Sequence, residues 1–195
     1  MKIGVLALQG DFREHRLSLE KCGAEVVEVR LPEHLAGLSG LILPGGESTT
    51  IGKLMVAYAL LEPIREFGRD HALWGTCAGA ILLSKNAGAL DQPLLKLMDT
   101  HMQRNAFGRQ LESFETDLPV PFLKPSQPDY HAVFIRAPIF TEIYGEARPI
   151  LTLPDGRVVA AQQGWWLATA FHPELTEDLR FHRYFLELAQ STSAD

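Results

Sequence analysis

Short apolar runs alternate along the chain with longer segments whose apolar residues recur at helical spacing. Residues 3–8 read Ile-Gly-Val-Leu-Ala-Leu, a nearly continuous apolar run typical of a strand that is covered on both faces. A helix is predicted over 12–22, and Gly23 suits its C-terminal end. Further strands are predicted at 26–29, 41–43 and 73–74, and further helices at 48–67 and 78–85, with Pro63 starting a new turn or kinking the longer helix.

The second half of the chain has a different character. Residues 86–130 hold five prolines and mixed polarity, so loops and short strands are expected there. Later strands are predicted at 133–136, 150–153, 157–162 and 166–171, two of them joined by a hairpin turn at Asp155-Gly156. Thr176 is predicted to cap a last helix, whose buried stripe is Phe181, Tyr184, Phe185 and Leu188.

This alternation predicts an α/β fold with an open, mostly parallel central sheet flanked by helices and joined by right-handed crossovers. In such sheets ligands collect at the carboxyl ends of the strands, where two glycine-rich turns of this chain fall. A single domain over 1–190 is expected, followed by a frayed tail at 191–195. Apolar residues make up 46% and charged residues 22% of the 195 residues, which is ordinary for a globular protein.

Charge and cysteine content narrow the class of protein further. The formal net charge is −6 and no basic run of five residues occurs, so no nucleic-acid partner is expected. No apolar stretch approaches the ~20 residues that cross a bilayer, and the N-terminus shows no signal-peptide pattern. The two cysteines, Cys22 and Cys77, have neither disulfide-framework nor metal-site spacing. We therefore expect a cytoplasmic protein.

Residues 75–79 read Gly-Thr-Cys-Ala-Gly and lie between a predicted strand and a predicted helix. This Gly-x-nucleophile-x-Gly pattern is typical of a nucleophile elbow, where the tight turn leaves no room for flanking side chains. The start of a helix favours a thiolate at Cys77, and the N–H of Ala78 can face a developing oxyanion. The alternative is a buried cysteine in a glycine-rich turn. Cys22 lies on an apolar helix face and is expected to fill the core.

A cysteine hydrolase also needs a base and a group that orients the base. His172 and Glu174 lie in Phe-His-Pro-Glu, directly after a predicted strand. Pro173 disfavours a helical backbone at His172. In an extended backbone, His172 and Glu174 can project to the same side because they are two positions apart. Glu174 can then hold one imidazole nitrogen and leave the other for the thiol. A surface turn with an accidental His and Glu is the alternative reading.

A second glycine-rich turn, Pro-Gly-Gly-Glu-Ser-Thr at 44–49, follows the third predicted strand. Its glycines would let the backbone approach a substrate closely, and we expect the N–H of Gly46 to serve an oxyanion together with Ala78. A phosphate-binding loop does not fit the spacing, and no Gly-x-Gly-x-x-Gly follows the first strand. A purely structural tight turn remains the alternative.

The elbow and the distal His-Pro-Glu resemble class I, triad-type glutamine amidotransferases. More narrowly, the chain resembles the glutaminase subunits of pyridoxal 5′-phosphate synthase, in stretches that run from the first strand to the last helix. These stretches are Ile3–Asp11, Leu41–Thr50, Gly75–Gly79, Arg104–Gln110, Val133–Pro138 and Phe171–Asp178. The resemblance implies that Cys77 is the nucleophile, His172 the general base and acid, and Glu174 the residue that orients the imidazole.

The resemblance also implies where glutamine binds. Its expected contacts are Gly46, Glu47, Ser48, Arg104, Ile135 and Arg136, and arginine can bind the α-carboxylate of glutamine bidentately. Surface ion pairs are the alternative role for the two arginines. Gln9 is placed near the oxyanion turn or a partner interface.

The activity that the resemblance implies is hydrolysis of L-glutamine to glutamate and ammonia, with no metal and no organic cofactor. The implied partner is a (β/α)8-barrel synthase that uses the ammonia to make pyridoxal 5′-phosphate. Three alternatives stay open: a glutaminase subunit of another synthase such as imidazole glycerol phosphate synthase, a cysteine peptidase or chaperone-like protein of related fold, and a non-catalytic binding module.

Overall fold

The computed structural model describes residues 1–88, 91–104 and 113–192. Within them, a central sheet has the strand order β10-β11-β12-β4-β3-β1-β2. Its parallel part consists of β1 (Lys2–Leu6), β2 (Glu25–Val29), β3 (Gly40–Leu43), β4 (Ala72–Thr76) and β12 (Trp166–Thr169). An antiparallel edge is added by β10 (Arg148–Thr152) and β11 (Val158–Gln163). The predicted α/β fold with a mostly parallel sheet is confirmed.

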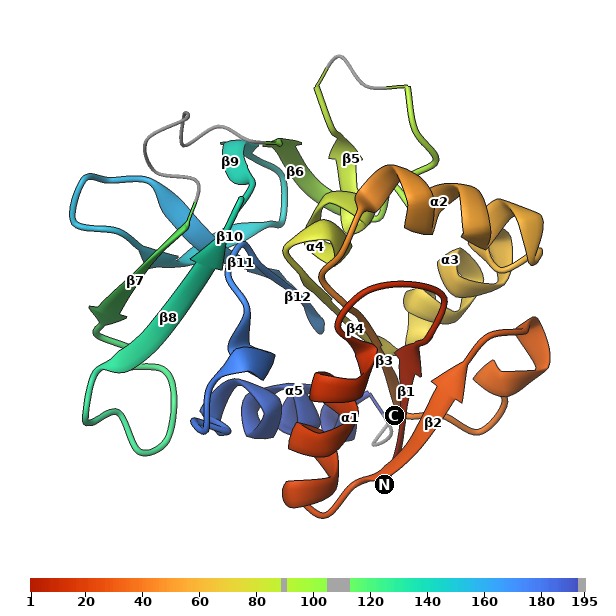
Figure 1. The fold of residues 1–195 in the computed structure, drawn as a ribbon, viewed down its shortest axis with the longest axis horizontal. Helices are drawn as coiled ribbons and strands as arrows, with labels where there is room; N and C mark the ends of the chain where they lie inside the picture. The colour runs from red at the N-terminus through yellow and green to blue at the C-terminus, as the bar shows by residue number, and fades with distance from the viewer. Residues whose placement is uncertain (89–90, 105–112, 193–195) are drawn as a thin grey trace.

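Helices cover both faces of this sheet (Figure 1). On one face lie α1 (Phe12–Lys21) and α5 (Arg180–Ser191), and on the other lie α2 (Ser48–Ala57), α3 (Leu61–Asp70) and α4 (Ala78–Leu83). Two 3₁₀ turns, η1 (Pro32–Leu35) and η2 (Pro173–Leu175), complete the layers. The central strands are apolar on both sides because both faces pack against helices, and every residue of β3 and β4 is buried.

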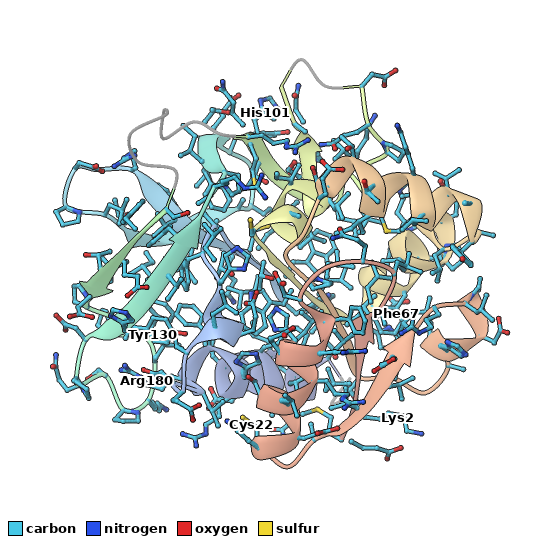
Figure 2. All side chains as sticks on the ribbon, in the orientation of Figure 1. Lys2, Cys22, Phe67, His101, Tyr130 and Arg180 are labelled. Atoms are coloured by element: carbon cyan, nitrogen blue, oxygen red, sulfur yellow. The ribbon has the colours of Figure 1, made fainter. Side chains whose placement is uncertain are left out.

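Two smaller sheets border the central one (Figure 1). The first consists of β5 (Ser84–Asn86), β6 (Met98–Gln103) and β9 (Ile139–Ile143), and the second is a hairpin of β7 (Ser113–Leu118) and β8 (Tyr130–Ile135). Tyr130 and Arg180 lie next to each other where β8 approaches α5 (Figure 2), with the guanidinium 5.5 Å from the ring centroid. The Arg180 side chain also donates to the backbone oxygens of Pro125 and Asp129, which fixes the loop before β8.

Several predicted boundaries differ from the structure. The helix predicted over 48–67 is two helices, because the chain turns at Ala59 with a φ of +54°. Pro63 fits the first turn of α3, where backbone N–H groups lack helical acceptors. The strand at 139–143 was not predicted, since the apolar alternation there is short. The hairpin turn at 155–156 does join β10 and β11.

The prediction that Thr176 caps the last helix is wrong. Thr176 is extended and ends η2, and α5 begins at Arg180 after Leu179. The Thr176 hydroxyl accepts a hydrogen bond from the Asp178 N–H instead, so the chain makes a further turn before the helix starts. The buried face of α5 includes Phe181 and Phe185, as predicted.

The last helix continues into the segment that was expected to be a frayed tail. Because α5 extends to Ser191, the first residue of the expected tail is helical, and residues 193–195 lie outside the described residues. Residues 105–110 of the family-like stretch Arg104–Gln110 also lie outside the described residues. Over the described ranges, none of the helices combines the length and apolar character that crossing a lipid bilayer requires.

Candidate active site

Four segments that are distant in the sequence meet at one edge of the parallel sheet. They directly follow β1, β3, β4 and β12, which run parallel to one another in adjacent positions. The carboxyl ends of parallel strands share an edge, so these four segments converge there. They carry Gln9 and Asp11, the Gly45–Gly46 turn, Cys77, and the His172–Glu174 pair respectively.

Cys77 occupies a sharp bend between β4 and α4. Its backbone has φ +48° and ψ −103°, a conformation that costs a non-glycine residue on the order of 1–3 kcal/mol. The Cys77 N–H donates to the Thr169 carbonyl of β12 at 2.8 Å, which ties the bend to the sheet. The side chain is 8% exposed and lines a cavity at the sheet edge. The bend thus directs the thiol toward the cavity instead of the core.

The glycines on either side of this bend are required by close backbone contacts. A Cβ on Gly75 would lie 2.4 Å from the carbonyl carbon of Gly79. A Cβ on Gly79 would lie 1.9 Å from the Leu43 carbonyl oxygen of β3. Both contacts are to backbone that cannot move aside, so the structure contains the tight turn that the Gly-x-Cys-x-Gly pattern predicts.

His172 and Glu174 form a buried hydrogen-bonded pair beside the thiol. His172 Nδ1 lies 2.7 Å from Glu174 Oε1, and His172 lines the same cavity as Cys77. Burial opposes protonation of His172, but the hydrogen bonds with Cys77 and Glu174 outweigh it and raise the pKa of the imidazole to about 10. Burial raises the pKa of Glu174, although its bond with His172 acts in the opposite direction. Pro173 starts η2, which places both side chains on the same side.

The Gly45–Gly46 turn packs against the segment that follows β1. The Gly45 carbonyl accepts a hydrogen bond from the Asp11 N–H at 3.1 Å, and this bond sets the orientation of the Gly45–Gly46 peptide. Gly46 has a φ of +149°, which favours glycine. The Gln9 side chain accepts a hydrogen bond from the Glu47 N–H at 2.8 Å, so Gln9 lies against the turn.

A cavity of about 340 Å³ opens in front of Cys77. Small-molecule sites typically measure about 300–1,000 Å³, so this cavity suits a ligand the size of an amino acid. Ten residues had been predicted for the site from the sequence, and all but Glu174 line the cavity. The nine are Gly46, Glu47, Ser48, Cys77, Ala78, Arg104, Ile135, Arg136 and His172. Glu174 lies behind His172, with no exposed side-chain surface.

Opposite charges flank the cavity at Glu47 and Arg104, whose Oε1 and Nη2 atoms are 2.8 Å apart. Glu47 also caps α2 by accepting hydrogen bonds from Thr49 and Thr50. Burial opposes ionisation, but these bonds together with Arg104 lower the pKa of Glu47 to about 2. Ser48 lines the cavity while its hydroxyl donates to Gln92.

Asp11, His172 and Glu174 are the one group of three potential metal-ligating side chains found among the described residues, with ligand atoms within 4.8 Å of one another. Nδ1 of His172 makes a 2.7 Å hydrogen bond to Glu174 and lies 3.5 Å from Asp11 Oδ2. That nitrogen carries the shared proton and is not available to a metal. The geometry therefore favours a proton-holding role for the group.

Sequence reasoning did not single out Asp11 or Leu175, which also line the cavity. Asp11 could have been found, because it follows the first predicted strand and so belongs at the same sheet edge as Cys77. Leu175 directly follows the His-Pro-Glu motif and is 43% exposed. No signal in its immediate sequence indicates a cavity position.

A thiol beside an imidazole that a buried carboxylate orients, at the carboxyl edge of a parallel sheet, is the arrangement of a triad-type cysteine hydrolase. Comparison with known proteins agrees with this class. Residues 5–191 match the SNO glutamine amidotransferase family, and the chain belongs to this family.

Curated relatives match over nearly the whole chain. The pyridoxal 5′-phosphate synthase subunit PdxT of Roseiflexus sp. (strain RS-1) is 56% identical over 191 residues, covering 96% of this chain and 100% of the relative. The PdxT subunit of Deinococcus radiodurans is 55% identical and covers 97% of each chain. A crystal structure of a glutamine amidotransferase superposes with a TM-score of 0.90 at 52% identity, covering 96% of this chain and 98% of that one.

Proposed function

We propose that this protein hydrolyses L-glutamine to glutamate and ammonia, as the glutaminase subunit of a pyridoxal 5′-phosphate synthase, with Cys77, His172 and Glu174 as its catalytic triad. The observation that carries the proposal is that Cys77 and His172 line one cavity, with Nδ1 of the imidazole 2.7 Å from the buried carboxylate of Glu174. Family membership and the PdxT relatives support glutamine as the substrate and pyridoxal 5′-phosphate synthesis as the reaction that uses the ammonia.

The charges around the cavity suit free glutamine, which is a zwitterion at neutral pH. Arg104 can bind its α-carboxylate and Glu47 its α-ammonium group, since the two side chains present opposite charges at one wall. Ile135 and Arg136 extend this wall along the end of β8. The carboxamide then points toward Cys77 at the other end of the cavity.

In the first step His172 accepts the thiol proton of Cys77, and the sulfur attacks the carboxamide carbon of glutamine. A C–S bond forms, and the carbonyl oxygen becomes an oxyanion that the N–H groups of Gly46 and Ala78 stabilise. Loss of one such donor typically slows a hydrolase ~10²–10³-fold. His172 donates its proton to the nitrogen, the C–N bond breaks, and ammonia leaves a glutamyl thioester on Cys77.

In the second step His172 accepts a proton from a water molecule, whose oxygen attacks the thioester. The C–S bond breaks, glutamate is released, and the proton returns to the sulfur. Glu174 holds the imidazole in one tautomer and balances its positive charge in both steps. Apart from the attacking water, both steps use side chains and backbone groups of this chain.

Ammonia must reach its acceptor before water protonates it, because ammonium is not a nucleophile. This requirement supports docking of the chain on a synthase, which we propose to be a (β/α)8 barrel. The Gly45–Gly46 peptide is held by the Asp11 N–H, and we propose that docking reorients it so that Gly46 N–H faces the oxyanion. Both cysteines are free thiols, which fits the cytoplasmic location that we propose.

The test measures glutamate release from glutamine by the purified chain, alone and with the cognate synthase. We expect Cys77→Ala to abolish hydrolysis and Cys22→Ala, which removes a thiol outside the cavity, to retain it. Product formation by the synthase with glutamine as sole nitrogen source should follow the same pattern. Hydrolysis that survives Cys77→Ala would refute the mechanism, and full activity without the synthase would refute the proposed reorientation.

A further inference from the structure

Behind the proposed triad lies a buried pair of histidines that the mechanism above does not use. His15 of α1 and His182 of α5 are fully buried, and the two helices lie side by side on one face of the sheet (Figure 1). Both imidazoles make edge-to-face contacts with the Trp74 ring, with ring centroids 5.5 Å apart for His15 and 5.0 Å apart for His182. The two imidazole rings are tilted against each other, with their centroids 5.2 Å apart. Burial lowers the pKa of both imidazoles, that of His182 to about 3, so both are neutral.

His15 connects this pair to the triad. Its Nε2 atom lies 3.3 Å from Glu174 Oε2 and 3.0 Å from the hydroxyl of Thr76, the residue directly before Cys77. Its Nδ1 atom lies 3.1 Å from His182 Nε2. Glu174 Oε2 is buried and makes no hydrogen bond of regular geometry to the described residues. His15 Nε2, at 3.3 Å, is a polar atom that faces it.

The burial of His182 Nδ1 determines which ring nitrogens of His182 and His15 carry protons. His182 Nδ1 is buried without a hydrogen-bond partner among the described residues. A proton on that atom would be an orphaned buried donor, which is costly, so the proton of His182 belongs on Nε2. His182 Nε2–H then donates to His15 Nδ1, and the single proton of His15 lies on Nε2.

A second observation gives the same result independently. In the opposite tautomer His15 Nε2 would present a lone pair to the Glu174 carboxylate at 3.3 Å, a repulsive contact between two acceptors that a hydrogen bond from the Thr76 hydroxyl at 3.0 Å offsets only in part. With the proton on Nε2, His15 faces the carboxylate as a donor. Both arguments place the protons so that His182 donates to His15 and the N–H of His15 faces Glu174.

We propose that His15 is a positioning residue whose Nε2–H is shared between the Thr76 hydroxyl and Glu174 Oε2, in a tautomer fixed by His182. This inference deepens the proposed function and rests on it. Glu174 then has one oxygen bonded to His172 and the other facing the N–H of His15, which restrains the carboxylate that orients the imidazole. His15 does not line the cavity, so it acts through Glu174 and not on glutamine.

The proposal predicts a kinetic effect that loss of packing alone does not produce. His15→Leu removes the donor, and His15→Gln keeps an N–H at the position that corresponds to Nε2. We expect His15→Leu to lower kcat of the complex with the synthase about tenfold at unchanged KM, and His15→Gln to recover most of that loss. Leu19→Ala, a buried substitution on the same helix, controls for displacement of α1 and should lower Tm without this change in kcat.

The pH profile gives a second readout. The ionisable groups that face Glu174 are His172, His15, Asp11 and Tyr130. Since a donor on Oε2 stabilises the carboxylate, its loss favours protonation of Glu174. The acidic limb of the kcat profile should therefore move to higher pH in His15→Leu and return in His15→Gln. Unchanged kcat and an unmoved limb in His15→Leu would overturn the proposal.

The tautomer can be measured in the wild-type chain without any substitution. Nitrogen-15 NMR of labelled imidazoles distinguishes Nε2–H from Nδ1–H, and we expect Nε2–H on both His15 and His182. A proton on Nδ1 of His15 would overturn the proposal even if every variant failed to fold. An inactive wild-type complex with the Nε2–H tautomer would refute the proposed function alone, whereas the hydrogen-bond assignment would stand.

Discussion

Replacing Glu174 with glutamine tests how the proposed triad controls its proton. The substitution keeps the shape of the side chain and removes the charge that faces His172 at 2.7 Å. Glu174 has no exposed side-chain surface and does not line the cavity. We therefore expect Glu174→Gln to lower kcat and to leave the KM for glutamine nearly unchanged.

The size of the effect follows from the loss of one charge. A hydrogen bond to a charged group contributes about 1.5–3 kcal/mol and a neutral one about 0.5–1.5 kcal/mol. Two opposite charges 4 Å apart attract by about 4 kcal/mol at an effective dielectric constant of 20, which is an upper bound for the total. A loss of about 3 kcal/mol corresponds to roughly 10²-fold in kcat and to a fall of about 2 units in the pKa of His172.

The assay is the pH dependence of kcat for the complex with the synthase. The pKa of His172 is raised to about 10, and its imidazolium must donate a proton to the leaving ammonia. The alkaline limb should therefore lie near that pH in the wild type and move downward in Glu174→Gln. Glu142→Gln is the matched control, because Glu142 Oε2 lies 2.9 Å from Nδ1 of His101 and neither residue lines the cavity. A Glu174→Gln enzyme with wild-type kcat and an unmoved limb would refute the reasoning.

Three further predictions concern the elbow and the wall of the cavity. Gly79→Ala places a Cβ 1.9 Å from the Leu43 carbonyl oxygen, so Tm in thermal unfolding should fall and no activity should remain. Arg104→Met should raise the KM for glutamine about 10–100-fold with little change in kcat, because one charge-assisted contact is lost; an unchanged KM would exclude Arg104 from glutamine binding. The pKa of Glu47 is lowered from 4.5 to about 2, so its ionisation stabilises the fold above pH 4.5 and this contribution is lost as pH falls toward 2. Denaturant unfolding of Glu47→Gln should lack that pH dependence, and an identical dependence in both chains would contradict the assignment.

Much of the site could be predicted because its proposed catalytic residues lie in short local sequence patterns. The Gly-x-Cys-x-Gly turn requires glycines at 75 and 79, and the contacts of both positions with backbone show why. His172 and Glu174 are close in the sequence, and Pro173 restricts the chain between them. Apolar strand runs identified the parallel sheet and therefore the edge at which these motifs meet.

The predictions that failed depend on contacts with distant parts of the chain. Thr176 is a common type of cap, but its hydroxyl lies 3.4 Å from the Tyr130 hydroxyl of β8, and the last helix begins only at Arg180. The β9 strand pairs with β6, and its short pattern alone does not indicate a partner. Such elements gain their stability from pairing and burial, which local propensity does not contain.

The sequence by itself determined the class of fold, the bend that carries the thiol, and the imidazole and carboxylate that serve it. Only the tertiary structure decided that Arg104 pairs with Glu47 at the wall of the cavity and that His15 lies against the buried Oε2 oxygen of Glu174. The physical reason is that a turn is specified by the backbone conformation of neighbouring residues. The partner of a buried polar atom is instead specified by which helices and strands the whole chain packs together.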